Sequence, residues 1–179
     1  MIIFETQRLI ARYWEPNKDA EQAFRIYSHP EVTHFIRAPK DIPANVDEQR
    51  DALLKKCAEY SQFNDGTGSW ALEEKGTGVV VGSVIVKWLP DADRVPTTDM
   101  EVGWHLGREH WGRGFATEAG TRAARYALEI LGQDVIYAVV RPANERSVRV
   151  TQRIGMQPRG TTDKYYGVEL LLFELRADK

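Results

Sequence analysis

Hydrophobic positions in the first half of the chain recur with two different periods, and they predict both strands and helices. Alternating apolar and polar residues predict a strand over residues 8–14. Two further strands are predicted over residues 70–74 and 79–88, and the apolar run 79–86 within the second is typical of a buried strand. Apolar residues spaced as on one helix face predict helices over residues 19–28 and 46–61, and Asn45 can cap the second one. The last two strands are joined by a short glycine-containing turn, which predicts an antiparallel pair, and the proline-containing segment 89–98 predicts an irregular loop.

The second half of the chain has a more regular order of elements. Its pattern predicts helices over residues 115–131 and 144–155, and strands over residues 100–106, 135–140, 156–161 and 168–176. The run 135–140 is apolar at consecutive positions, which is typical of a strand covered on both faces. No repeat, linker or low-complexity segment interrupts this order, so the whole sequence predicts one mixed α/β domain.

Composition narrows the class of protein. The chain has 179 residues, a length typical of one domain, with 42% hydrophobic and 28% charged residues. Its single cysteine, Cys57, excludes an internal disulfide and a thiolate metal cluster, and its helical position predicts a core thiol. The N-terminus has no basic segment and no apolar run approaches ~18 residues, so we expect a cytoplasmic protein without a membrane partner.

Charge is distributed unevenly along the chain. The net charge of −2 argues against a nucleic-acid partner. Residues 1–106 carry 12 basic and 17 acidic groups, whereas residues 107–159 carry 9 basic groups, all arginine, and 5 acidic groups. One interpretation is ordinary variation among solvated faces. The other is a middle segment that binds an anion, beside an N-terminal half that binds a cation.

A glycine-containing loop lies between a predicted strand and a predicted helix. In the run EHWGRGFA at residues 109–116, two glycines permit close backbone approach just before a helix, where free N–H groups favour an anion. A tight strand-to-helix turn is the simpler interpretation. The loop matches neither a dinucleotide fingerprint, since Thr117 stands where the third glycine is due, nor a phosphate-binding loop with Gly-Lys-Ser/Thr.

Several runs in the right order resemble one protein family. EVGWHL at residues 101–106 and WGRGFATEA at 111–119 are similar to the acetyl-CoA-binding core of GNAT acetyltransferases of the RimJ/RimL type. TQRL at residues 6–9 resembles an N-terminal strand of that family, and residues 140–156, from VRPANERSVRV to IGM, resemble one of its helices. The resemblance covers nearly the entire chain.

The resemblance implies a fold and its subdivision. We expect a single GNAT-like mixed α/β (α+β) domain over residues 1–179, with a central, mostly antiparallel twisted sheet. The sheet would be splayed at the acetyl-CoA site and flanked by about four helices. Residues 1–98 would form the acceptor-side half, 99–155 the acetyl-CoA-binding core, and 156–179 the C-terminal strands.

The family pattern also implies cofactor-binding residues. The strand at 104–106 would bind the pantetheine arm through its backbone, and one of its amides would polarise the thioester carbonyl. The loop would hold the pyrophosphate through its backbone and the Arg113 side chain, while Glu109, an acid where the family often has Gln or Arg, would point away. Asn144 would contact the cofactor, or would simply cap its helix. The predicted cofactor-binding residues are Trp104, His105, Leu106, Gly112, Arg113, Gly114, Phe115, Ala116, Thr117 and Asn144.

Two residues are candidates for catalysis. Glu101 is the predicted base, because an ammonium group must lose a proton before it attacks a thioester. The resemblance implies that Ser147 lies near the sulfur and acts as the acid. The alternatives are a surface ion pair for Glu101 and a solvated helix position for Ser147. Tyr165 or Tyr166 would act as the acid instead of Ser147, or would pack or line the acceptor site. The histidines lack ligand spacing with carboxylates, so no metal is predicted.

The resulting hypothesis is an acetyl-CoA-dependent N-acetyltransferase that acts by direct transfer in a ternary complex. The acceptor would be a primary amine on a peptide N-terminus or a small molecule such as a polyamine or antibiotic. Residues 38–45 and the loop 89–98 would line its site, and the protein would be a monomer or homodimer. A non-catalytic acyl-CoA sensor and a nucleotide-binding protein are the alternatives.

Overall fold

One eight-stranded sheet runs through the molecule. The computed structural model describes residues 1–36 and 38–177, so Asp178 and Lys179, at the end of the predicted domain, lie outside the described residues. Neighbouring strands are antiparallel except β5 and β6, which are parallel. The strands, in sheet order, are β1 (Ile2–Glu5), β2 (Leu9–Arg12), β3 (Gly68–Glu74), β4 (Val80–Pro90), β5 (Pro96–Leu106), β6 (Val135–Val140), β8 (Leu170–Arg176) and β7 (Gln157–Thr162).

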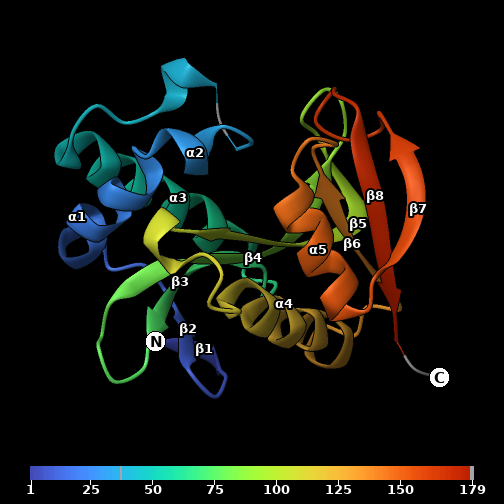
Figure 1. Cartoon of the computed structure of the whole chain (residues 1–179), viewed down its shortest axis with the longest axis horizontal. Coiled ribbons are helices and arrows are strands. Elements are labelled where there is room, and N and C mark those ends of the chain that lie inside the picture. The colour runs from blue at the N-terminus through green and yellow to red at the C-terminus, as the bar shows by residue number, and fades with distance from the viewer. Residues whose placement is uncertain (37, 178–179) are drawn as a thin grey trace.

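Helices cover both faces of this sheet. They are α1 (Pro16–Tyr27), α2 (Pro30–Thr33), α3 (Val46–Phe63), α4 (Phe115–Arg125) and α5 (Glu145–Ile154). Figure 1 shows α1, α2 and α3 gathered at one side of the molecule, and α5 beside β6, β8 and β7 at the other. The predicted mixed α/β fold with a mostly antiparallel sheet is confirmed. The prediction of about four helices omitted α2, which is too short for a helical period to be recognised.

Apolar cores on the two faces of the sheet hold α1, α2, α3 and α4 to it, and a smaller one packs Val148 and Ile154 of α5 against β6 and β8. On one face, α4 buries Phe115, Ala119 and Ala123 against strand residues such as Leu72 and Val102. On the other face, α1, α2 and α3 pack against β3 and β4, and the core residues there are Trp14, Ala23, Ile26, Tyr27, Val32, Leu53, Ala71 and Val80. Cys57 packs at the edge of this second core and is only half-buried, so it is not the core thiol that the sequence predicted.

The sheet opens between its two central strands. β5 and β6 are in register at one pair, Glu101 with Tyr137, whereas β4 and β5 pair along almost their full length. Beyond Glu101, residues 102–106 of β5 have no register pair in β6 among the described residues. The predicted splay is therefore present, and it leaves one edge of β5 open.

Several local predictions need correction. Only the middle of the segment 89–98 is a loop, residues 91–95, because β4 continues to Pro90 and β5 begins at Pro96. The run at residues 6–9 is chiefly the turn between β1 and β2, not a strand. The predicted helix 115–131 becomes a π-helical turn at Tyr126–Ile130, and Ile130 at its end is 64% exposed.

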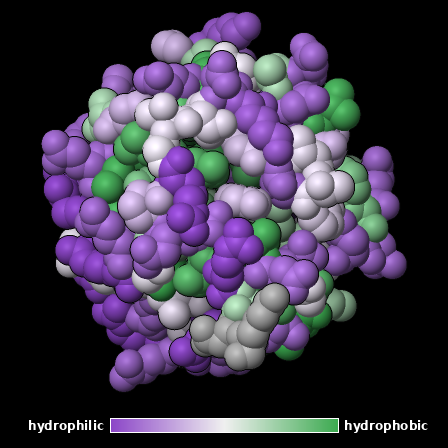
Figure 2. All heavy atoms as spheres, turned by 90° about the vertical axis from the view of Figure 1, so that its right-hand side faces the viewer, coloured by the Kyte–Doolittle hydropathy of each residue, from purple (hydrophilic) through white to green (hydrophobic). Residues whose placement is uncertain are grey.

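The sheet edge formed by β7 faces solvent. Five of the six β7 residues are exposed, and Pro158 lacks the N–H that an added strand would need. The face of the molecule on that side is predominantly hydrophilic, with scattered apolar residues (Figure 2).

The inner strand β6 is less covered than predicted: its residues alternate between buried and half-buried positions. No helix of the described residues is long and apolar enough to cross a membrane.

Candidate active site

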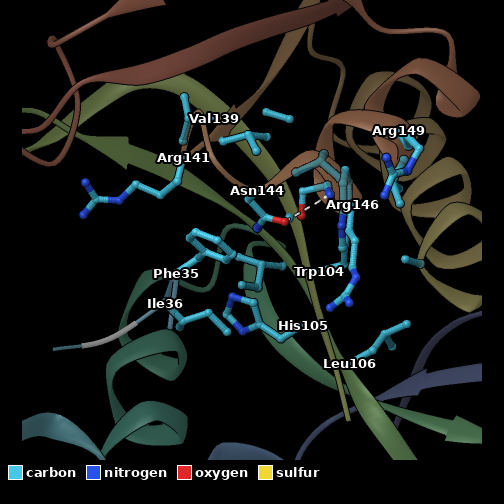
Figure 3. A pocket seen from close by; sticks show the side chains of 18 of the residues that line it. Phe35, Ile36, Trp104, His105, Leu106, Val139, Arg141, Asn144, Arg146 and Arg149 are labelled. Atoms are coloured by element: carbon cyan, nitrogen blue, oxygen red, sulfur yellow. Dashed lines mark hydrogen bonds between the residues drawn. The ribbon is translucent and has the colours of Figure 1, made fainter. Parts of the chain in front are cut away.

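A cleft of about 1400 Å³ fills the opening between β5 and β6. Residues 102–106 of β5 and 138–140 of β6 form two of its walls. The others come from α2, the glycine loop with the start of α4, and α5. Figure 3 shows Asn144 and Arg146 at the start of α5, with Phe35, Ile36 and His105 across the cleft from Arg146. The cleft thus joins segments from both halves of the chain.

The glycine loop ends in a backbone shape that favours glycine. Gly112 and Gly114 have φ values of +75° and +81°, and a Cβ on Gly112 would meet no atom within 4 Å. This left-handed backbone, not lack of space, excludes other residues, at a cost of roughly 1–2 kcal/mol. Gly114 is also the N-cap of α4, and no side chain caps that helix. Its first N–H groups are therefore available to an anion in the cleft.

The turn at residues 6–9 fastens this loop to the rest of the protein. Glu118, in the first turn of α4, accepts hydrogen bonds from the Thr6 hydroxyl at 2.6 Å and from the Arg8 backbone N–H at 2.8 Å. The Arg8 guanidinium donates to Glu118 at 2.7 Å and to the Arg113 carbonyl at 2.9 Å. Burial raises the pKa of Glu118, but these hydrogen bonds outweigh it and hold the pKa below its usual value. The charged Glu118 therefore fixes the loop and the start of α4 relative to β1 and β2.

Arg113 lies differently from its predicted position. Its guanidinium pairs with Glu74 at the end of β3, lies 3.4 Å from His110 Nδ1 and stacks 4.5 Å from the Phe115 ring centroid. Its side chain does not line the cleft. The guanidinium that was predicted to bind the pyrophosphate is therefore held outside the cleft. Only the backbone of Arg113 can take part in binding by the loop. Glu109 is also absent from the cleft wall, as expected.

The start of α5 contributes both of its predicted residues to the cleft. Asn144 is the N-cap, and its Oδ1 accepts the Ser147 N–H at 3.2 Å, the dashed line in Figure 3. The capping role raised as an alternative is therefore present. Asn144 and Ser147 both line the cleft, and both are half-buried.

Arginines on α5 form a wall that the sequence analysis did not single out. Arg146, Arg149 and Arg153 line the cleft, because spacings of three and four place them on one helix face. Arg149 pairs with Glu145 at 3.2 Å, and Arg146 lies 4.2 Å from the Trp111 ring centroid. No carboxylate in the described parts of the chain pairs with Arg146 or Arg153. The spacing in the helix could have revealed this wall.

Glu101 lies where β5 and β6 begin to separate. Its side chain is 12% exposed, lines the cleft and lies 3.6 Å from Lys87 Nζ. Its Oε2 accepts a hydrogen bond from the Tyr166 hydroxyl at 2.6 Å. Glu101 thus forms an ion pair, although at a buried position and not at the surface, and it also faces the cleft, so its role as the base stays a prediction.

The two tyrosines before β8 have different positions. Tyr166 lines the cleft, whereas Tyr165 is buried outside it and donates to Asp99 at 2.7 Å. Burial, followed by the negative charge of Glu101, raises the pKa of Tyr166, so its hydroxyl stays protonated. Of the two tyrosines considered as the acid, only Tyr166 can reach a ligand in the cleft.

The three predicted residues at the end of β5 all line the cleft. The Trp104 side chain packs toward α4 and α5, and Leu106 belongs to the same core, whereas His105 faces α1 with its ring edge-on to Tyr27 at 6.0 Å. Because these side chains are engaged elsewhere, the open backbone edge is what this strand offers a ligand.

The wall opposite the cofactor segments differs from the prediction. Residues 38–45 do not line the cleft, and only Arg94 does so from the segment 89–98. Val32, Phe35 and Ile36, in and after α2, take that place. Sequence reasoning missed them because a helix of four residues has too few positions to show a face.

Comparison with known proteins identifies the family. Residues 8–157 match the family described as the acetyltransferase (GNAT) domain. The chain is a GNAT acetyltransferase. An uncharacterised N-acetyltransferase of Bacillus subtilis, YoaA, is 31% identical to this acetyltransferase over 91% of the chain and 87% of its own length.

Solved structures share this GNAT fold. An acetyltransferase from Bacillus anthracis has a TM-score of 0.76 at 19% identity and covers 98% of both chains. RimL, a ribosomal L7/L12 α-N-protein acetyltransferase solved with coenzyme A, has a TM-score of 0.77 at 11% identity and covers 99% of both chains. These similarities show the fold.

GNAT enzymes use acetyl-CoA, and the cleft of this acetyltransferase has groups that fit it. The uncapped start of α4 and the arginines of α5 suit phosphates, and the open edge of β5 suits an amide-containing arm. Within the described residues, no group of three or more His, Cys, Asp or Glu side chains could hold a metal ion.

Proposed function

We propose that this protein transfers an acetyl group from acetyl-CoA to a primary amine within a ternary complex. The observation that carries the proposal is the position of Glu101. This carboxylate lies at the point where the sheet opens, in the same cleft as the uncapped start of α4 and Ser147. A base, an anion site and a hydroxyl thus face one cavity.

The cofactor end of the cleft is formed by backbone groups and arginines. The N–H groups of residues 112–117 would bind the pyrophosphate, and Arg146, Arg149 and Arg153 would bind the remaining phosphate charge. The edge of residues 104–106 would bind the pantetheine amides as a neighbouring strand does, with Asn144 across the cleft. The bound thioester supplies an electrophilic carbonyl.

The acceptor end of the cleft supplies proton transfer. Glu101 would accept the proton that an ammonium group must lose before its nitrogen attacks. Tyr166 holds one carboxylate oxygen by its hydrogen bond, which leaves the other oxygen for the amine or a water molecule. As the nitrogen–carbon bond forms and the carbon–sulfur bond breaks, the Ser147 hydroxyl would donate a proton to the departing thiolate.

We further propose the RimJ/RimL-type subgroup and a protein N-terminal α-amino group as the acceptor. The motif resemblance supports this, as do the similar folds of RimL and of a ribosomal-protein-S5-alanine acetyltransferase from Vibrio fischeri, the latter with a TM-score of 0.73 at 20% identity. An α-amino group with a pKa near ~8 needs a weaker base than a lysine near ~10.4.

The test measures thiol release from acetyl-CoA over a panel of peptides and small amines. For Glu101→Gln we expect kcat to fall roughly 10²- to 10⁴-fold with unchanged CoA affinity, because only proton transfer is lost. Ser147→Ala should lower kcat less, since water can replace a hydroxyl donor. Glu129→Gln, at an exposed position outside the cleft, is the matched control.

One result would contradict the role of Glu101, and another would contradict the proposed catalysis. Full turnover by Glu101→Gln would remove this residue from the mechanism. Tight CoA binding by the wild-type protein without acetylation of any amine would favour the sensor function instead.

A further inference from the structure

The loop between β4 and β5 presents Arg94 to the cleft in a fixed position. Asp91 accepts the N–H groups of Asp93 and Val95 on its carboxylate, both at 2.9 Å, and the N–H of Arg94 on its carbonyl at 3.2 Å. The same carbonyl accepts the Tyr166 N–H at 3.2 Å, which ties this loop to the one before β8. These bonds fix the backbone of Arg94 at the cleft, while its side chain is exposed to solvent.

The backbone of Arg94 is strained. Its φ is +68°, in the left-handed region that favours glycine or asparagine. Such a conformation costs of order 1–3 kcal/mol in a non-glycine residue, and strain of this kind is found preferentially at ligand-binding sites. A glycine would serve the turn at lower cost, so the side chain needs a separate explanation.

The guanidinium of Arg94 lines the cleft beside the proposed base. It lies 5.5 Å from the ring centroid of Tyr166, whose hydroxyl is bonded to Glu101. Lys87 lies 5.1 Å from the same centroid and 3.6 Å from the Glu101 carboxylate. No carboxylate of residues 1–36 or 38–177 forms an ion pair with Arg94.

The charged side chains that line this end of the cleft have an excess of positive charge. Lys87 balances Glu101, and the other acid of the nearby wall, Glu31, pairs with Arg108 at 3.2 Å. Arg94 is the remaining lining charge, because its loop neighbours Asp91 and Asp93 do not line the cleft and the Asp91 carboxylate accepts backbone N–H groups. A second ammonium group on the acceptor would be repelled here, whereas a carboxylate would find a positive partner close to the base.

We propose that the acceptor is a primary amine that carries a carboxylate near its amino group, and that Arg94 binds this carboxylate. The proposal rests on the proposed acetyltransferase function and narrows its substrate class to acidic amines. It also differs from one interpretation of the sequence, in which the acidic N-terminal half binds a cation. The charge at the site, and not that of the whole segment, decides the preference.

The experiment compares two matched sets of acceptors with acetyl-CoA. One set is three amidated peptides with N-terminal alanine and Glu, Gln or Lys at the second position. The other is 4-aminobutanoate, 4-aminobutanamide and 1,4-diaminobutane. We expect kcat/KM to fall from the acidic to the neutral to the basic probe, by roughly three- to tenfold per step, as for a partly exposed ion pair.

Two charge reversals separate this role from a general effect of charge. Arg94→Glu should invert the order of probes, whereas Arg125→Glu, an equal change at an exposed position outside the cleft, should preserve it. CoA affinity should be the same in both variants. Melting temperatures would show that both variants are folded.

The outcomes distinguish the acidic-acceptor proposal from the proposed acetyltransferase function on which it rests. Turnover without a dependence on probe charge, or an unchanged order in Arg94→Glu, would overturn the acidic-acceptor proposal and leave the acetyltransferase intact. Failure to acetylate any probe would count against both.

Discussion

The two ends of the cleft are built in different ways. The proposed cofactor end comes from two continuous segments, 102–119 and 140–156, and would use backbone N–H groups, left-handed glycines and one helix face of arginines. The acceptor end is assembled from separated segments, with Phe35 and Ile36 after α2, Lys87 on β4, Arg94 on a loop and Tyr166 before β8. Under the proposed function, acetyl-CoA would thus be held by local structure, whereas selectivity for the acceptor would depend on side chains that only the tertiary fold brings together.

The largest effect expected at the cofactor end is that of Arg146→Ala. Removing one charged hydrogen-bond partner of a phosphate costs about 1.5–3 kcal/mol, so calorimetry should show CoA binding weakened about ten- to hundredfold. Acetyl-pantetheine, which has no phosphates, should bind the wild-type protein and Arg146→Ala equally. If Arg146→Ala weakens both ligands alike, or no more than Arg125→Ala does, the arginine wall does not bind phosphate.

A smaller effect is expected from Gly112→Ala, with Gly132→Ala as its matched control. Both glycines have positive φ, +75° and +67°, and a Cβ at either would meet no atom within 4 Å. Each variant should therefore lose a similar free energy of unfolding, roughly 1–2 kcal/mol. Only Gly112 lines the cleft, so only Gly112→Ala should also weaken CoA binding. Equal CoA affinities in the two variants would contradict a role for the loop shape in binding.

The smallest effect is expected from Tyr166→Phe, at the acceptor end. Its raised pKa keeps the wild-type hydroxyl protonated, so it can donate to Glu101 Oε2 and hold that carboxylate in place. Without this hydrogen bond, kcat/KM for the amine should fall a few-fold, with CoA affinity unchanged. Tyr13→Phe, at an exposed site, is the control. A weaker CoA affinity with an unchanged kcat/KM for the amine would mean that Tyr166 acts at the cofactor end instead.

The difference between local segments and segments far apart in the chain also explains which parts of the site the sequence could predict. The glycine loop, the cap Asn144 and the position of Glu101 on its strand follow from short-range pattern, and the structure places all of them at the cleft. Arg113 was misplaced because its partner, Glu74, is 39 residues away on another strand. The bond from Tyr166 to Glu101 spans 65 residues, so no local spacing could indicate which of two adjacent tyrosines would form it.

Hydrogen exchange of the protein with and without saturating CoA tests the division of the cleft most directly. Residues 102–106 on the open edge of β5, and the loop 112–117, should gain protection on binding, because the cofactor would bond to the N–H groups that they present. The loop 91–95 beside Glu101 should exchange as before. Protection of residues 91–95 with none at 102–106 would contradict the account, since the cofactor would then lie at the end assigned to the acceptor.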